Sequence, residues 1–117
     1  MSVMSDLGSE VAEAPTTLEL TVSEKDGETV LRAAGELDVN TAPELREQLA
    51  RLVNDGVRQI VVDLTDVSFV DSTALSVLVS ALKRLRQVDG DLMLASPTPS
   101  VRRVFEITGL TRLFTIR

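Results

Sequence analysis

The chain has 117 residues, a length that fits one domain. It contains no Cys and no His, which excludes disulfides, thiolate chemistry, a Cys-type zinc site and a histidine general base. The formal net charge is −6, although residues 72–117 carry a net charge of +4. The only aromatic residues are 3 Phe, so we expect contacts with proteins and no binding of nucleic acid.

The N-terminal end of the chain differs in composition from the remainder. Residues 1–15 are small, polar and acidic, and they predict a disordered acidic tail, with the folded domain at residues 16–117. The chain has neither an uninterrupted apolar run of membrane-spanning length nor a basic-then-apolar signal pattern. We therefore expect a cytoplasmic protein that does not associate with membranes.

The first half of the folded part predicts a strand pair followed by a helix. Apolar residues alternate at residues 17–24 and 29–37, and the turn between them has hairpin composition, so the two strands should be antiparallel. Thr41 and Glu44 have the spacing of a capping box, and Pro43 fits the first helical turn. The helix should end near Gly56, which can adopt a left-handed cap.

The second half alternates strands and helices. The pattern predicts a buried strand at residues 59–64, a short polar loop at 65–70, and a helix from Ser72 to about residue 89. A core strand at 91–95, a helix at 98–109 and a short edge strand at 113–116 follow. This alternation predicts a single α/β domain in which helices pack on a sheet.

A hydroxyl group lies where the predicted central strand passes into a helix, in the sequence Asp71-Ser72-Thr73. The simplest interpretation is a helix N-cap. The functional interpretation is that Ser72 accepts a phosphoryl group, because a helix start favours anions. Thr73 and Ser76, which is one turn further on, are rival acceptors.

Asp38 is a second candidate, because it lies just before the predicted helix that begins near Thr41. It can be a turn residue. Alternatively, it lies beside Ser72 and accepts hydrogen bonds from a basic residue of a partner, since the loops that follow neighbouring parallel strands meet at one edge of the sheet.

Three carboxylates in and after the predicted central strand allow a third interpretation. Asp63, Asp66 and Asp71 could form a magnesium site with a phospho-aspartate, as in receiver domains. That chemistry usually needs a late Lys, whereas Lys25 falls in the predicted hairpin and Lys83 in mid-helix. We therefore expect no metal site and no cofactor.

Four apolar residues outside the main stripes are expected in the core. The alternative is an exposed apolar patch that binds a partner. They are Phe69, Leu110, Leu113 and Phe114.

Four segments together resemble one family. They read GELD at 35–38, IVVDL at 60–64, DSTAL at 71–75, and PSVRRVF at 99–105 with TGL at 108–110. In order and spacing, the chain from about residue 18 to 117 resembles the STAS domain, and more narrowly the bacterial anti-sigma factor antagonists.

The resemblance implies a mixed β-sheet with helices packed on it, and a function by partner switching. The unmodified antagonist binds a kinase-type anti-sigma factor, which then releases its sigma factor. The anti-sigma factor phosphorylates Ser72 with ATP, the complex dissociates, and a PP2C-type phosphatase resets it. The protein is thus a substrate and a binding module, with no enzyme activity of its own.

The resemblance also implies which residues contact the partner. Asp38 matches the acidic contact residue of the family, and Asp71, Thr73 and Ala74 adjoin Ser72. Family members commonly have Gly at the positions of Ala74 and Ser76, so these small side chains should add to the contact surface and change partner specificity. The alternative is a STAS scaffold or transporter-associated subunit in which Ser72 only caps a helix.

Overall fold

The computed structural model describes residues 18–117, so the predicted acidic tail at residues 1–15 lies outside the described residues. Two long strands come first, β1 (Leu18–Lys25) and β2 (Glu28–Leu37), and they pair in antiparallel register with Leu18 opposite Gly35. The predicted hairpin is confirmed, and its turn places Asp26 and Gly27 at positive φ.

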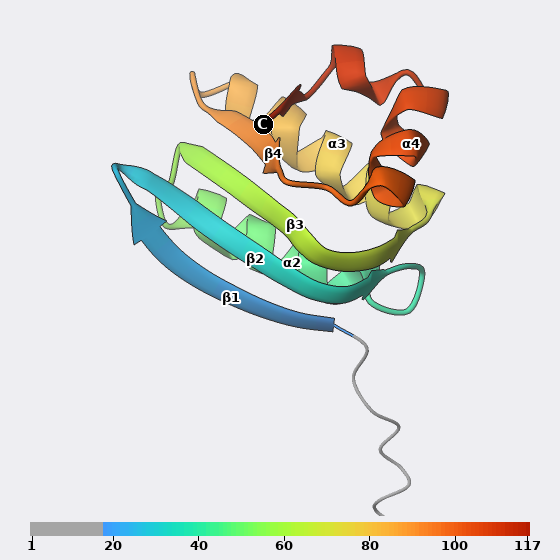
Figure 1. Ribbon diagram of the computed structural model, residues 1–117. Helices are drawn as coiled ribbons and strands as arrows, with labels where there is room; N and C mark the ends of the chain where they lie inside the picture. Colours follow the sequence, from blue (N-terminus) through green and yellow to red (C-terminus); the bar gives the residue numbers. More distant parts are fainter. Residues whose placement is uncertain (1–17) are drawn as a thin grey trace, which may run out of the picture.

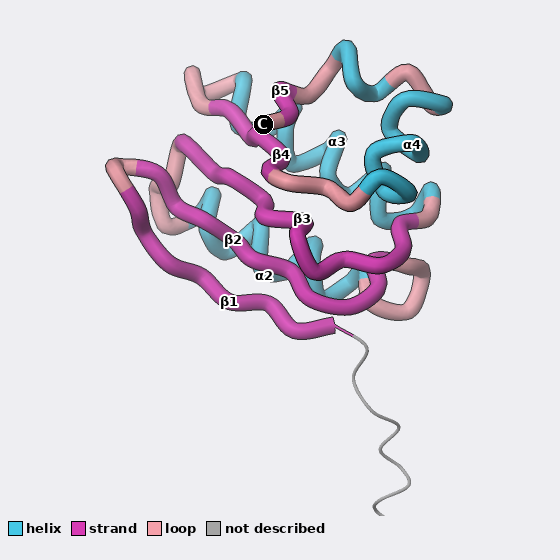
Figure 2. The backbone as a smooth tube through the Cα atoms, in the orientation of Figure 1, coloured by secondary structure: helices cyan, strands magenta, loops and turns pink. Residues whose placement is uncertain are grey.

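The remaining elements alternate between helix and strand. They are α2 (Ala42–Asn54), β3 (Gln59–Val70), α3 (Ser72–Arg86), β4 (Asp91–Ala95), α4 (Pro99–Ile107), the 3-10 helix η1 (Leu110–Arg112) and β5 (Thr115–Ile116). The strands form one sheet in the order β1-β2-β3-β4-β5, in which only β1 and β2 are antiparallel to each other. The mixed sheet with helices packed on it is the predicted α/β architecture (Figures 1 and 2).

The main core lies between the sheet and the helices α2 and α3, which run along the same face of the sheet (Figure 1). The predicted helical stripes face this core: Leu45, Leu49 and Leu52 of α2 are buried, as are Leu75, Leu78, Leu82 and Leu85 of α3. Helix α4 adds Phe105, whose ring meets that of Phe114 edge-on at 5.9 Å. None of the helices within residues 18–117 is long and apolar enough to cross a membrane.

The structure corrects the predicted loop at residues 65–70. Strand β3 continues to Val70, and its second half pairs with β2 up to Leu37 opposite Val70. Two register shifts interrupt this pairing, which lets β3 bend and breaks the strict alternation of apolar and polar residues. Thr65, Asp66 and Ser68 are polar because they are exposed on the strand.

The predicted capping box at the start of α2 is also wrong. Thr41 makes no side-chain cap to its helix, because its hydroxyl donates a 2.7 Å hydrogen bond to the carbonyl of Glu36. Asp38 organises the helix entry in its place: its carbonyl oxygen accepts from the amides of Thr41 (3.1 Å) and Ala42 (2.8 Å).

Candidate functional site

The connections from β2 to α2 and from β3 to α3 lie side by side at one end of the sheet. Strands β2 and β3 are parallel and end side by side, with Leu37 opposite Val70. The loop from Asp38 to Thr41 therefore lies beside the start of α3, as expected from the sequence. The amide of Asp71 donates to the carbonyl of Leu37 (3.0 Å), so a backbone hydrogen bond joins the two strand-to-helix connections.

The carboxylate of Asp71 makes the second connection between these segments. One oxygen, Oδ1, accepts from the first-turn amides of Thr73 (2.9 Å) and Ala74 (3.1 Å). The other, Oδ2, accepts from the amide of Val39 (3.0 Å) in the neighbouring loop. Asp71 is thus the N-cap of α3 and also holds the loop that carries Asp38. Its contacts within the chain are those of a positioning residue.

Asp38 is a turn residue, and it is half-buried. Its Oδ1 accepts from the amides of Asn40 (2.9 Å) and Thr41 (3.1 Å), while its own amide donates to the hydroxyl of Thr41 (3.0 Å). Among the described residues, Oδ2 of Asp38 has no hydrogen-bond donor. The turn role and the partner-contact role are therefore compatible, because one oxygen serves the turn and the other is available.

The three candidate acceptor hydroxyls differ in accessibility. Ser72 is the first residue of α3 and is exposed, and its hydroxyl makes no hydrogen bond within residues 18–117. The hydroxyl of Thr73 also makes no hydrogen bond within residues 18–117, but Thr73 is half-buried. Ser76 is exposed, and its hydroxyl donates to the carbonyl of Ser72 (3.1 Å). Ser72 therefore has the least constrained hydroxyl of the three.

The structure changes the expected setting of a phosphate on Ser72. The first-turn amides that would bind an anion, those of Thr73 and Ala74, already donate to Asp71. A phosphate on Ser72 would therefore lie beside a carboxylate and find these donors occupied. Its charge of about −1.5 to −2 would project to solvent and add to that of Asp71.

A groove of about 410 Å³ begins at Ser72 and runs between α3 and the segment after α4; we call it the Ser72 groove. Hydroxyl groups and apolar side chains alternate along it, and none of its lining residues is charged. The lining residues are Ser72, Leu75, Ser76, Val79, Ser80, Thr108 and Leu110.

Large exposed apolar side chains surround the same edge. Val39 is 61% exposed and its amide bonds to Asp71; Phe69 is 50% exposed and lies two residues before Asp71. Ile107, 73% exposed, adjoins Thr108 of the Ser72 groove. Apolar side chains gathered beside a groove are typical of a protein-binding surface.

The expectation that Phe69 belongs to the core is wrong, because the bend of β3 exposes its ring. Phe114 is buried as expected, whereas Leu110 and Leu113 are only partly buried and pack on the edge of the core.

The expectation that the Ala74 side chain adds to the contact surface is also wrong. Ala74 is fully buried among the core residues, because the third position of α3 faces inward. Ser76 is exposed and does add a side chain to this surface.

Asp63, Asp66 and Asp71 do not converge on one site. Asp63 accepts from the hydroxyl of Thr65 (2.6 Å), Asp66 pairs with Arg32, and Asp71 caps α3. Within residues 18–117, no group of three or more carboxylates is placed to hold a metal ion.

Sequence reasoning missed Val39, Ile107 and Thr108 as parts of this surface. A signal for Ile107 was present, because it falls outside the apolar stripe that Val101 and Phe105 form on α4. Val39 gave no signal, since its position depends on the hydrogen bond to Asp71.

Comparison with known proteins shows which family the chain resembles. The model of the STAS domain matches residues 19–117. The chain is 46% identical over 83 residues to the anti-sigma-B factor antagonist of Staphylococcus aureus, a match that covers 71% of this chain and 77% of that protein.

Two solved structures are similar across most of the chain. An anti-sigma factor antagonist from Mycobacterium paratuberculosis superposes with a TM-score of 0.80 at 30% identity, covering 88% of this chain and 87% of that one. The Bacillus cell fate determinant SpoIIAA in its phosphorylated form gives a TM-score of 0.66 at 25% identity, covering 85% and 91%.

Proposed function

The chain belongs to the STAS domain family, and from this premise we propose that it is an anti-sigma factor antagonist controlled by phosphorylation of Ser72. Unmodified, it binds a kinase-type anti-sigma factor, which then releases its sigma factor. The anti-sigma factor transfers the γ-phosphoryl group of ATP to the Ser72 hydroxyl, and a PP2C-type phosphatase removes it. The chain acts as a substrate and a binding partner, with no catalytic role.

The observation that carries this proposal is the position of the Ser72 hydroxyl. It is exposed and unpaired among the described residues, and it stands at the end of a groove flanked by exposed apolar side chains. A kinase can therefore reach the hydroxyl, and a partner seated on this surface covers it. The resemblance to SpoIIAA, which has been solved in a phosphorylated form, adds support.

Electrostatics explain how one phosphate can switch the complex. A phosphoserine carries about −1.5 to −2 charge, and at about 6 Å from a carboxylate of the partner the repulsion is roughly 1 to 5 kcal/mol, depending on the effective dielectric. Because each 1.4 kcal/mol is about tenfold in affinity, this range suffices to dissociate a complex. Asp71, whose carboxylate lies next to Ser72, adds to the negative potential at this position.

The contacts expected with the anti-sigma factor follow from exposure. The free Oδ2 of Asp38 should accept from a basic residue, while Phe69 and Ile107 should pack against apolar side chains of the partner. Asp71 and Thr73 contribute mainly by fixing the shape of this surface.

The test compares two variants in binding to kinase-type anti-sigma factors of the source organism. Ser72→Ala should bind whether or not ATP is present, and Ser72→Asp should bind at least tenfold more weakly. Ser100→Asp, which places the same charge at the start of α4, serves as the matched control. Equal affinities of the two Ser72 variants would exclude the switch and leave Ser72 as a helix-capping position in a STAS scaffold.

A further inference from the structure

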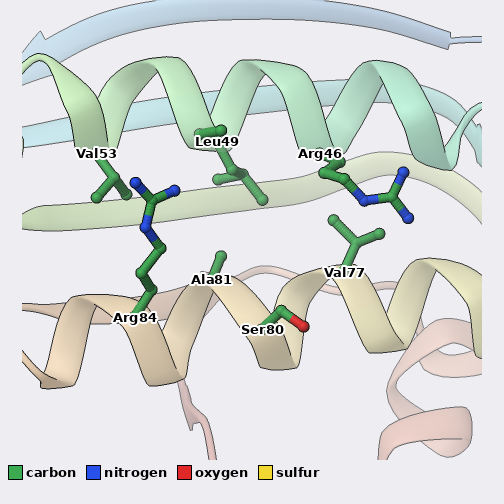
Figure 3. A pocket seen from close by; sticks show the side chains of 8 residues that line it. Arg46, Leu49, Val53, Val77, Ser80, Ala81 and Arg84 are labelled. Carbon is green, nitrogen blue, oxygen red and sulfur yellow. The ribbon is translucent and has the colours of Figure 1, made fainter.

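A second groove, of about 310 Å³, lies between α2 and α3; we call it the arginine groove. Figure 3 shows its apolar floor, with Leu49 and Val53 on α2 facing Val77 and Ala81 on α3. The side chain of Arg46 stands toward one end of the groove and that of Arg84 toward the other.

The groove carries positive charge that its surroundings do not neutralise. No Asp or Glu lines it. The guanidinium of Arg84 donates to the neutral amide oxygen of Asn54 (2.6 Å), and Arg46 has no ion pair with any of residues 18–117. A groove of this kind selects an occupant that combines apolar side chains with carboxylates.

We propose that the occupant is the N-terminal segment of the same chain, residues 3–13. This segment has no Lys or Arg. Its carboxylates would pair with the two arginines, while its apolar side chains would cover the floor of the groove. The acidic residues are Asp6, Glu10 and Glu13, and the apolar ones are Val3, Met4, Leu7 and Val11.

The point of attachment allows this arrangement. Leu18 pairs with Gly35 at the end of the sheet where β2 leads into α2, and Arg46 lies in the first half of α2. The described part of the chain therefore begins at the end of the sheet that is nearer to Arg46 than to Arg84. Four residues lie between Glu13 and Leu18. The five residue steps from Leu18 to Glu13 reach about 17 Å when extended, more than the 10–12 Å diameter of the helix that the chain must pass.

The charges can also be matched in spacing. From Arg46 to Asn54, the partner of Arg84, α2 rises over eight residues, or about 12 Å. The seven residue steps from Asp6 to Glu13 can span this distance. Because the segment is attached to the domain, its local concentration is in the millimolar range, so weak pairing suffices to populate the docked state.

The absence of Cys from the chain makes a direct test possible. Ser9→Cys accepts a single nitroxide label in the full-length protein, and NMR then measures the paramagnetic broadening of methyl groups. The methyls of Val53, Val77 and Ala81 should broaden at least twofold more than those of Leu113, which does not line the groove. The reversal Arg46→Glu with Arg84→Glu should abolish this difference.

Two further variants separate docking from loss of structure. Arg51→Glu with Lys83→Glu makes the same charge change on the same two helices outside the groove, and should leave the broadening intact. Replacing the three acidic residues of the segment by Lys in the Arg-to-Glu background should restore the broadening, and it alters no residue of the folded domain.

Three results would overturn the proposal. The first is groove broadening that survives the reversal of both arginines. The second is equal loss of broadening in the Arg51 and Lys83 control. The third is broadening that appears only between chains, when labelled protein is mixed with isotope-enriched unlabelled protein, since that assigns the groove to a second copy. None of these results depends on phosphorylation of Ser72.

Discussion

Removing the carboxylate of Asp71 tests whether one side chain holds both halves of the candidate site. Asp71→Ala deletes three acceptor contacts, to the amides of Thr73 (2.9 Å), Ala74 (3.1 Å) and Val39 (3.0 Å). Loss of an N-cap costs about 1 kcal/mol, and loss of a hydrogen bond to a charged group about 1.5 kcal/mol. We therefore expect the free energy of unfolding to fall by about 2 to 3 kcal/mol.

The assay is urea denaturation followed by circular dichroism, with Thr98→Ala as the reference. Thr98 caps α4 through one hydrogen bond, of 3.3 Å to the amide of Val101, so its loss should cost about 1 kcal/mol. In NMR spectra, the amides of Val39 and Asn40 should shift in Asp71→Ala and stay in place in Thr98→Ala.

The reasoning fails if Asp71→Ala destabilises the protein no more than Thr98→Ala does, or if the Val39 amide keeps its chemical shift. Either result would mean that Asp71 is an ordinary helix cap and that the loop containing Asp38 is positioned by its own turn.

The remaining predictions concern a pH effect, the core and the exposed surface. Hydrogen bonds donated by Arg117 lower the pKa of Glu28 from 4.5, so this pair stabilises the fold above that pH; the stabilisation should be lost as the pH falls through the lowered pKa. Urea midpoints at pH 7 and pH 3 should therefore differ less in Glu28→Gln than in the parent chain. Ala74→Leu should destabilise the fold by about 1 to 3 kcal/mol in urea denaturation, because that position is fully buried. An unchanged urea midpoint would mean that the Ala74 side chain is exposed. Phe69→Ala should weaken binding to the anti-sigma factor at least tenfold by calorimetry, whereas Val22→Ala, on an exposed position of β1, should leave it unchanged.

Most of the architecture could be predicted because each element has a local cause. The alternation in the first two strands, the buried run at Ile60, Val61 and Val62, and the stripes of the helices each follow from burial on one or both faces. The antiparallel first pair followed from the hairpin turn and the mixed sheet from the family resemblance, and both are confirmed.

The errors share a physical origin, which is competition between local and tertiary partners. Thr41 has the sequence of a cap, but its hydroxyl bonds to Glu36 across the loop. Residues 65–70 resemble a loop in sequence because two register shifts interrupt the alternation of apolar and polar residues in a strand whose outer side is exposed. Such bonds and bends depend on neighbours that local patterns do not contain.

Some features of the candidate site could also be predicted from local sequence, and others could not. Ser72 at the start of α3 could be found from the strand-to-helix pattern alone. Three other features depend on how β3 bends and on how the two strand-to-helix connections lie beside each other. Ala74 faces the core, Phe69 faces solvent, and the carboxylate of Asp71 accepts from the amide of Val39.

The most direct test of the account is the location of phosphate on the chain. Full-length protein is incubated with ATP and an extract of the source organism, treated with acid, and fragmented in a mass spectrometer. The account predicts one acid-stable phosphate on Ser72 and none in Ser72→Ala. Phosphate confined to Thr73 or Ser76, an acid-labile adduct, or no phosphate at all would contradict it.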